Sequence, residues 1–410
     1  MERVKLPQAG WRTRDGLDRL CTVLGSARGE VRFVGGAVRD TLLGAGFGAE
    51  PGLDIADVDL ATVHSPERVM ALLKENAIKA VPTGLAHGTV TAVLPNGSPV
   101  EVTTLRCDVA TDGRHATVAF TDNWREDAAR RDFTINALYA DPASGEIFDY
   151  FGGLDDLEAR RVRFIGDPLK RIAEDHLRIL RFFRFHARFG DEVDPDGLEA
   201  CTARANDLMA LSRERIAMEL LKLLVAVHAV DVVALMIEHG IFVPVLPEIT
   251  SPEPLARLVR REAGADIAPD PIRRLAALLP KNTEIAEDVG ARLKLSKADR
   301  KRLVSGVQPI PNEPANVLAY RIGTTFAIDR LLLLDWPEAE AKSLKGWQPP
   351  SLPISGGALV ERGLRRGPEV ATVLRIVEDQ WLAENFPDEE RVKAIADAAV
   401  AQWLRPSSRA

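Results

Sequence analysis

Two aspartates stand two residues apart in an apolar segment, and together they could bind a cation. In the run LDIADVDLATV, Asp57 and Asp59 alternate with the apolar Val58 and Leu60. Side chains two positions apart in a strand point to the same face, so both carboxylates should project together while their neighbours pack into a core. Adjacent carboxylates in a dry place repel each other unless a divalent cation lies between them. Asp54 falls outside this alternation, and we expect it to be a turn or cap residue before the strand.

A third carboxylate should come from a neighbouring strand. In the run VEVTTL, Glu101 is the one acidic residue, and alternation puts it on the same face as Thr103. Asp57, Asp59 and Glu101 would then form a cluster for one or two Mg²⁺ ions, which in phosphoryl transfer activate an attacking hydroxyl and stabilise leaving pyrophosphate. A D-x-D pair alone usually belongs to a surface loop, but the apolar flanks favour a catalytic pair here.

Upstream of the aspartates, the run FVGGAVRD has features that suit binding of a triphosphate. Gly35 and Gly36 let the backbone approach a ligand closely, and their amides face the start of a predicted helix. Arg39 lies in the first turn of this helix and could hold a phosphate with a bidentate fork. A Gly-Gly pair before a helix is most often only a tight turn, so its place shortly before the aspartates carries the prediction.

A helix predicted over 168–188 carries an Asp–Arg pair that could recognise a nucleotide base. Asp167 should cap this helix and Pro168 should occupy its first position. Asp175 and Arg178 are three residues apart and should share a face. A carboxylate acceptor beside a guanidinium donor matches the edges of cytosine and adenine, whereas uracil and guanine present the reverse order and would leave buried groups mispaired. The alternative is an ordinary intrahelical ion pair.

Basic residues gather around this helix in an otherwise acidic chain. The whole chain has a net charge of −7, from 53 Lys and Arg against 60 Asp and Glu. The stretch 160–188 instead contains nine basic and three acidic residues. Arg181 and Arg184 follow Arg178 at helical spacing and, with Asn136, are candidates for further nucleotide contacts. A local basic face can bind a polyanion even on an acidic protein, and a solvated helix face is the alternative.

The composition suggests an intracellular protein of several domains. A length of 410 residues predicts two or three domains. The isolated Cys21, Cys107 and Cys201 suit a reducing cytoplasm and argue against a disulfide framework or a structural zinc site. The N-terminal residues lack the apolar region of a signal peptide, and the most apolar segment, 220–237, contains charged residues and predicts a packed helix. We therefore expect a cytoplasmic protein with no membrane contact and no evident obligate protein partner.

Secondary-structure signals change in character near residue 155. Over 30–140, short strands alternate with helices, and an Asn-Gly pair marks a hairpin. Beyond 155, helical periodicity takes over, and the Pro-rich run WQPPSLPISGG (347–357) indicates a linker. The expected fold class is α+β, with a small mixed sheet and its helices followed by an all-helical part.

Five ordered motifs resemble those of a known family. The runs GGAVRD, DVDL, RRDFTINA, EDHLRILRFFRF and SRERIAMEL follow one another within residues 30–240. They resemble the class II tRNA nucleotidyltransferases, which contain CCA-adding enzymes and similar bacterial poly(A) polymerases. The resemblance implies a nucleotidyltransferase head, a helical neck with base recognition, a helical body and a helical tail that contacts tRNA, at 1–145, 146–245, 246–345 and 346–410.

The resemblance also implies roles for individual residues. It implies Mg²⁺ at Asp57 and Asp59, and ribose binding by Arg131 and Asp132 of RRDFTINA, where a carboxylate accepting from a 2′-hydroxyl would select ribonucleotides. It further implies a base-reading role for the Asp–Arg pair described above.

The segment 107–127 is rich in Asp, Gly and Thr, and we expect it to be mobile. In the family this region helps the switch from C to A addition, which makes Arg125 and Asp127 candidate participants.

The expected activity is addition of CCA to the 3′ end of tRNA. The tRNA 3′ hydroxyl would attack the α-phosphate of CTP and then of ATP, with Mg²⁺ as cofactor and pyrophosphate as leaving group. A poly(A) polymerase shares these motifs, but such enzymes commonly have long basic extensions, whereas this chain is acidic and ends in the weakly basic RPSSRA. A CC-only or A-only adding enzyme is a related alternative. A non-catalytic RNA-binding relative is a hypothesis of another class, against which the intact aspartate pair argues.

Overall fold

The computed structural model describes residues 4–46, 57–112, 115–310 and 313–405, so the predicted turn role of Asp54 lies outside the described residues. The chain forms two compact units, residues 1–250 and 251–410. The finer division into head, neck, body and tail stays a prediction. Among the described residues, no helix is both long and apolar enough to cross a membrane.

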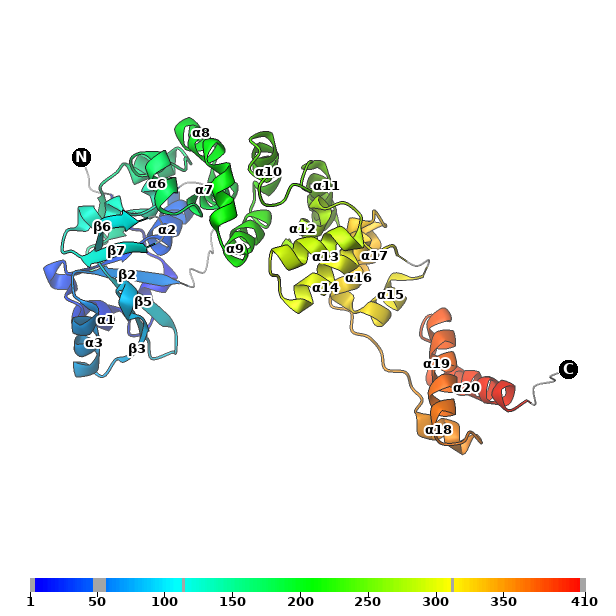
Figure 1. The fold of residues 1–410 in the computed structure, drawn as a ribbon. Coiled ribbons are helices and arrows are strands. Elements are labelled where there is room, and N and C mark those ends of the chain that lie inside the picture. Colours follow the sequence, from blue (N-terminus) through cyan, green and yellow to red (C-terminus); the bar gives the residue numbers. More distant parts are fainter. Residues whose placement is uncertain (1–3, 47–56, 113–114, 311–312, 406–410) are drawn as a thin grey trace. The chain divides into compact units, whose positions relative to one another are not determined.

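The first unit combines a seven-stranded sheet and a two-stranded sheet with helices (Figure 1). Its strands are β1 (Val31–Val34), β2 (Val58–Thr62), β3 (Lys79–Gly84), β4 (Thr89–Val93), β5 (Pro99–Thr104), β6 (Arg106–Asp112), β7 (His115–Phe120), β8 (Leu138–Ala140) and β9 (Ile147–Asp149). Its α-helices are α1 (Leu17–Val23), α2 (Gly36–Gly46), α3 (Pro66–Glu75), α4 (Trp124–Ala129), α5 (Gly153–Glu158), α6 (Pro168–Glu174), α7 (Arg178–Phe189), α8 (Pro195–Ala203), α9 (Arg213–Leu224) and α10 (Ala229–Glu238). A mixed sheet followed by many helices confirms the expected α+β class.

The large sheet has the strand order β3-β4-β5-β2-β1-β8-β9. Its central neighbours β2 and β5 run parallel, while the other pairs are antiparallel. Parallel neighbours cannot be joined by a tight turn, and here α3, β3 and β4 form the connection. The predicted Asn-Gly hairpin joins β4 to β5, with Gly97 at φ +86°, a conformation that glycine adopts without strain.

Two segments have local structure that the sequence did not predict. The segment 107–127 contains the antiparallel pair β6 and β7 and the start of α4, which is capped by Asn123, while its expected mobility stays a prediction. The single helix predicted over 220–237 is interrupted, because α9 ends at Leu224 and α10 begins at Ala229. In the interruption, the backbone N–H of His228 donates to the carbonyl of Ala187 in α7 at 2.8 Å, so the break docks onto a neighbouring helix.

An aromatic core joins the sheet to the first helices that follow it. Phe133, Phe164 and Phe182 are fully buried, and the rings of Phe164 and Phe182 stack at 5.6 Å. Phe133 lies in the RRDFTINA run and also packs against Phe185 of α7. The burial of such large side chains is worth several kcal/mol, so this core fixes the RRDFTINA loop against α7.

Gly153 marks a close approach of two backbones beside this loop. A Cβ atom at Gly153 would lie 2.4 Å from the carbonyl oxygen of Thr134, which is backbone and cannot rotate away. We expect Gly153→Ala to lower the free energy of unfolding by about 2 kcal/mol, because the loop must shift. Urea denaturation measures this change. The matched control is Gly44→Ala in α2, where nothing lies within 4 Å of the new Cβ and stability should rise slightly. Equal stability of both variants would contradict the prediction.

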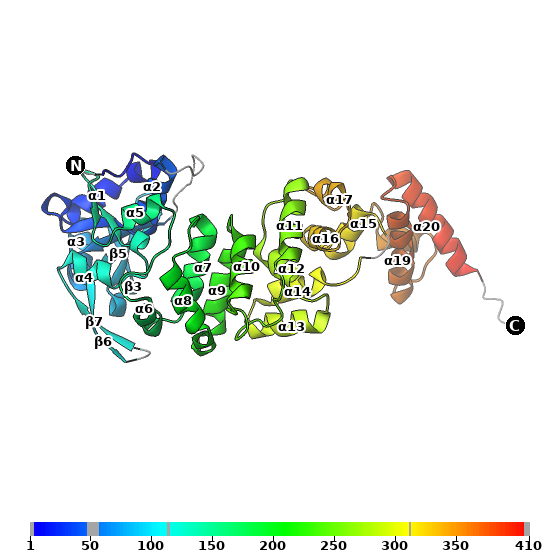
Figure 2. The same cartoon turned by 90° about the horizontal axis from the view of Figure 1, so that it is seen from above.

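Among its described residues, the second unit contains helices and no strands (Figure 2). Its α-helices are α11 (Glu253–Gly264), α12 (Pro271–Leu278), α13 (Thr283–Arg292), α14 (Lys297–Gly306), α15 (Ala315–Ile322), α16 (Thr324–Leu333), α17 (Glu338–Ser343), α18 (Gly356–Glu361), α19 (Pro368–Ala383) and α20 (Glu389–Leu404). The Pro-rich linker predicted at 347–357 covers the irregular stretch between α17 and α18. Helices α18 to α20 pack around the buried Trp381 together with Val317 of α15.

Candidate functional site

The predicted carboxylates come together on the two central strands. In the parallel pair of β2 and β5, Asp59 stands directly opposite Glu101. Val58 and Leu60, on either side of Asp59, are buried, as the alternation predicted. Asp57 immediately precedes β2 and is exposed. The fold therefore places one carboxylate from each of two adjacent strands side by side, with Asp57 at the end of the same strand.

The electrostatics of Asp59 show that these carboxylates affect one another. Burial raises the pKa of Asp59 to about 6, the charges of Glu101 and Asp57 add to the rise, and the charge of Arg131 opposes it. A bound cation would reduce the repulsion between these carboxylates, which raises the pKa of Asp59. Among the described residues, no three His, Cys, Asp or Glu side chains form a complete metal site. One or two carboxylates completed by substrate phosphates are nevertheless the usual protein ligands of Mg²⁺, so the residues present fit this ion.

The glycine turn lies next to these carboxylates. Val34, at the end of β1, pairs with Asp59 in the sheet, and Gly35 and Gly36 follow at once. Gly35 has φ +69°, which opens the turn into α2. A Cβ atom at Gly35 would lie 3.8 Å from a guanidinium nitrogen of Arg131, so a positive charge stands beside the turn. The N-terminus of α2 and this cation together favour an anion here.

Arg39 takes a more buried position than its predicted role in phosphate binding suggested. Its side chain is only 5% exposed, and it pairs with Asp40 at 2.8 Å. It also donates to Asn136 Oδ1. Asp40 in turn pairs with Arg188 of α7 at 2.9 Å. Direct contact of Arg39 with a phosphate stays a prediction, and its observed contacts tie α2 to the RRDFTINA loop.

Asp127 forms a buried hub that holds Arg131 in place. Its carboxylate accepts from Tyr139 Oη at 2.7 Å, from Arg130 at 2.7 and 2.9 Å, from Arg131 at 3.2 Å and from the backbone N–H of Arg106 at 3.1 Å. Burial alone would raise the pKa of Asp127, but the charges of Arg131 and Arg130 and the hydrogen bonds lower it to about 2. Tyr139 of β8 stands opposite Val34 of β1, which in turn stands opposite Asp59 of β2, so a single strand separates the hub from the carboxylates.

We expect Asp127→Asn to lower the free energy of unfolding at pH 7 by about 3 kcal/mol, because two arginines lose their buried counterion. The folded pKa of about 2 lies below the ordinary value of 3.8 for an aspartate in the unfolded chain, so the stabilisation is present above pH 4 and is lost as the pH falls towards 2. Urea unfolding at pH 7 and pH 3 measures both effects, with the exposed Asp122→Asn as control. An Asp127→Asn variant as stable as the parent at pH 7 would contradict a stabilising role of Asp127.

The second predicted aspartate of the RRDFTINA run, Asp132, is buried in a polar network. Its Oδ1 accepts from the Phe133 N–H and from Asn136 Nδ2, both at 2.9 Å. Its Oδ2 accepts two hydrogen bonds from Arg181 of α7, one of them at 2.7 Å. Because a carboxylate offers about four acceptor positions, a ribose hydroxyl would have to replace one of these donors. The structure thus brings Asp132, Asn136 and Arg181 together, and their contact with a nucleotide stays a prediction.

Arg184 lies one turn further along α7, where Glu219 of α9 pairs with it at 2.8 Å. Glu219 is buried and is also 4.0 Å from Arg181. Burial lowers the pKa of Arg184, and the Glu219 charge opposes that shift. The basic stripe predicted on this helix is therefore partly neutralised by a carboxylate from another helix.

The Asp–Arg pair lies at a break between two helices, so the single helix predicted over 168–188 is wrong. Helix α6 ends at Glu174, Asp175 has an extended backbone (φ −149°, ψ 104°), and α7 begins at Arg178. The backbone N–H of Leu177 donates to Asp175 Oδ1 at 3.1 Å. Such a hydrogen bond between an aspartate side chain and the nearby backbone competes with continuation of the helix. The predicted cap at Asp167 is confirmed.

Each member of the pair is held by a different partner. Asp175 accepts from Arg215 of α9 at 2.9 Å, while Arg178 pairs with Glu174 at 2.5 Å and donates to the carbonyl of Arg130 at 3.1 Å. Among the described contacts, Asp175 and Arg178 form no ion pair with each other, which argues against the intrahelical salt bridge. The carboxylate of Asp175 stays 35% exposed and the side chain of Arg178 13% exposed.

Several residues of the site were not predicted as such. Asp127 was named only as a candidate participant in the switch from C to A addition, and Arg215 entered only as part of the SRERIAMEL motif. A buried acid followed at i+3 and i+4 by two arginines was the available signal for the Asp127 hub. The signal for Arg215 was weaker, because its partner Asp175 lies 40 residues away. Arg125 lies over the ring of Phe151, at 5.1 Å, and has no described contact with the carboxylates.

Known proteins resemble this chain over most of its length. A protein-family model described as the poly A polymerase head domain matches residues 31–163, and one described as a probable RNA and SrmB-binding site of polymerase A matches residues 192–251. The CCA tRNA nucleotidyltransferase 1, mitochondrial, of Danio rerio is 37% identical over 91% of this chain and 88% of its own length. The human protein of the same name is 33% identical over 92% of this chain.

Solved structures agree with this similarity. The CCA-adding enzyme of Bacillus stearothermophilus in complex with CTP has a TM-score of 0.67 and 25% identity, covering 95% of this chain and 98% of its own. A CCA-adding enzyme complex with ATP has a TM-score of 0.68 at 21% identity, covering 94% and 95%. Nucleotidyltransferases of this family generally use divalent metal ions. The extent and level of identity show that the chain belongs to the class II tRNA nucleotidyltransferases, the family of the CCA-adding enzymes.

Proposed function

We propose that this chain adds the sequence CCA to the 3′ end of tRNA, using CTP and then ATP. In each step the RNA 3′ oxygen forms a bond to the α-phosphorus, the bond from that phosphorus to the β-phosphate bridge breaks, and pyrophosphate leaves while the hydroxyl proton passes to a base. The observation that carries the proposal is the placement of Asp59 opposite Glu101 beside the Gly35 turn and Arg131. The similarity to CCA tRNA nucleotidyltransferases over nine-tenths of the chain supports it.

We assign Mg²⁺ to Asp57 and Asp59, with Glu101 completing or supporting the cluster. When bound, the ion lowers the cost of charge on the attacking and leaving oxygens. The raised pKa of Asp59, caused by burial and then by Glu101, supports a cation at this place. The carboxylates would hold that cation at the beginning of β2, beside β5.

We assign the triphosphate to the turn at Gly35 and Gly36, with the positive charges of Arg131 and Arg39 beside it. The ribose is assigned to Arg131 and Asp132. Asn136 and Arg181 orient the Asp132 carboxylate through hydrogen bonds, so its acceptor oxygens have a defined direction. Arg184 supports Arg181 through their common partner Glu219.

We assign recognition of the base to Asp175 and Arg178. Arg215 fixes the carboxylate, and Glu174 with the Arg130 carbonyl fixes the guanidinium, so both groups are positioned before a nucleotide arrives. A pre-positioned acceptor and donor accept the edges of cytosine and adenine and are mispaired by uracil and guanine.

The direct test is extension of a tRNA that lacks its 3′ CCA, with CTP, ATP and Mg²⁺, each nucleotide alone and together. Three added nucleotides are expected, and no extension at all would overturn the proposal. A long A tract would identify a poly(A) polymerase, which the description of the matched head-domain family favours as second candidate. Products ending after CC, or the addition of A alone, would identify a partial enzyme.

The proposed location is the cytoplasm or another reducing compartment. The three cysteines are unpaired, and Cys21 and Cys201 are buried. Free buried thiols suit a reducing environment.

A further inference from the structure

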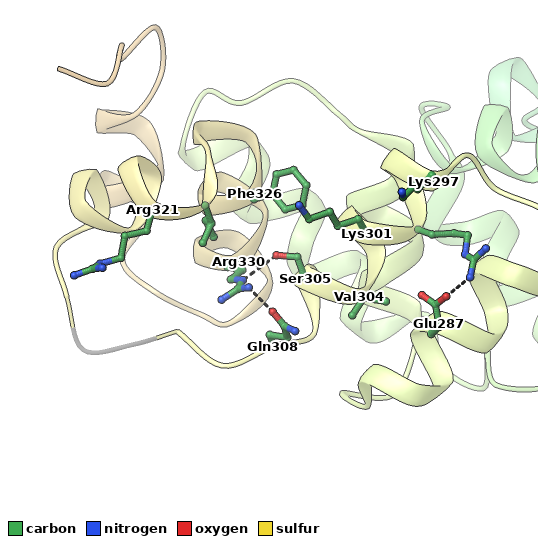
Figure 3. Close-up of a pocket in the computed structure, with 11 residues that line it drawn as sticks. Glu287, Lys297, Lys301, Val304, Ser305, Gln308, Arg321, Phe326 and Arg330 are labelled. Carbon is green, nitrogen blue, oxygen red and sulfur yellow. Dashed lines mark hydrogen bonds and ion pairs between the residues drawn. The ribbon is translucent and has the colours of Figure 1, made fainter. Parts of the chain in front are cut away.

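The second unit contains a cavity with a strong excess of positive charge. It has a volume of about 760 Å³ and is lined by residues of α13, α14, α15 and α16 (Figure 3). Its five cationic side chains are Lys297, Arg300, Lys301, Arg321 and Arg330. The single carboxylate of the lining, Glu287, is paired with Arg300.

Arg330 is a buried cation without a described counterion. The residue is 9% exposed, and its guanidinium donates to three neutral acceptors, Ser305 Oγ at 3.0 Å, the Pro309 carbonyl at 3.2 Å and Gln308 Oε1 at 2.5 Å. Burial lowers the pKa of Arg330. Figure 3 shows the guanidinium held between Ser305 and Gln308. A buried charge with only neutral partners is costly, and an anion in the cavity would offset that cost.

Two lysines supply positive charge at the exposed rim. Lys297 and Lys301 lie one turn apart on α14 and therefore share a face of the helix. Both are exposed, and within the described part of the chain neither forms an ion pair with a carboxylate. Arg321, by contrast, is already paired with Glu313 and Asp379.

Part of the cavity lining is apolar and includes an aromatic ring. Val304, Ile322 and Phe326 line the cavity and are partly exposed. In Figure 3 the ring of Phe326 lies next to the Lys301 side chain. An aromatic ring beside cations is the combination with which proteins bind unstacked nucleotides, through base stacking and phosphate contacts.

We propose that this cavity binds a nucleotide of the tRNA, with its phosphate near Arg330, Lys297 and Lys301 and its base against Phe326. The proposal rests on the proposed function, which supplies tRNA as the partner. The exposed lysines at the rim favour an RNA chain over a free nucleotide, because a chain continues beyond the cavity. The lining also offers no glycine-rich turn and no unpaired carboxylate for a metal-bound triphosphate.

The test is equilibrium binding of tRNA lacking CCA, measured without nucleotides over a range of salt concentrations. For Lys297→Ala/Lys301→Ala we expect Kd to rise about tenfold and the slope of log K against log salt to decrease by about 1 to 2. The matched control is Lys342→Ala/Lys345→Ala, which removes two exposed charges of the same unit outside the cavity and should leave Kd within about twofold. Thermal unfolding should be unchanged in both double variants.

Phe326→Leu separates stacking from charge, since it keeps an apolar side chain in the lining and removes the ring. We expect Kd for tRNA to rise about fivefold or more with an unchanged salt slope. Two results would overturn the proposal: lysine and phenylalanine variants that bind tRNA like the control, or variants that lose binding of free ATP at this unit while tRNA binding is unchanged. Binding is measured without catalysis. If the parent protein failed to extend tRNA, the proposed function would be overturned, but the effect of the cavity variants on tRNA binding could still be interpreted.

Discussion

Replacement of Asp59 by asparagine is expected to lower the rate of CTP incorporation by about three orders of magnitude, while the protein stays folded. Asparagine keeps the size of the side chain and removes the charge that faces Glu101 and Asp57. Without that charge the cluster loses affinity for a divalent cation, and the attacking and leaving oxygens lose the stabilisation that the cation provides. Single-turnover extension of tRNA at saturating CTP and Mg²⁺ measures the effect.

The stability of the same variant makes this prediction specific. Because burial and the two neighbouring carboxylates disfavour the charged form of Asp59, the neutral asparagine should unfold in EDTA at a temperature no lower than that of the parent. The control is the exposed Asp122→Asn, which should retain full activity. An Asp59→Asn protein that turns over normally would identify the chain as an RNA-binding relative without catalysis. One that is inactive because it is unfolded would assign Asp59 a structural role.

Replacement of Asp175 by alanine is expected to lower kcat/KM for CTP about a hundredfold and to reduce discrimination against UTP by a similar factor. The carboxylate is the acceptor that a cytosine or adenine amino group would meet, whereas the uracil carbonyl would face it with repulsion. Removing the acceptor therefore harms the correct nucleotide and spares the wrong one. Competition between CTP and UTP on one tRNA measures the ratio directly.

Two further variants define how Asp175 is held. Arg215→Ala should reproduce part of the loss of discrimination, because it frees the carboxylate without removing it. Asp191→Ala, which breaks an exposed ion pair with Arg160 in the same unit, should change neither rate nor discrimination. If Asp175→Ala lowered the rates with CTP and UTP equally, base recognition would have to lie elsewhere, and Asp175 would only support the break between α6 and α7.

Patterns in the sequence located the elements that depend on near neighbours. The alternation around Val58 and Leu60 predicted which side chains of β2 are buried, because a strand sends successive side chains to opposite faces. Asp167 and the Asn-Gly pair were likewise sufficient to place a helix start and a hairpin, since caps and turns involve only a few consecutive residues. Ordered motifs then identified the family, which the similarity to known enzymes establishes.

Local sequence patterns could not predict which charged side chains pair with each other, because these pairs depend on packing between segments that are distant in the sequence. The spacing of Asp175 and Arg178 predicted one helix and a shared face, yet the Asp175 side chain caps a break and binds Arg215 from 40 residues away. Asp132 is engaged by Arg181 of α7, a residue 49 positions further along the chain. Local spacing named the residues that carry charge, whereas their partners, burial and pKa values follow from how α7 packs against α9 and against the RRDFTINA loop.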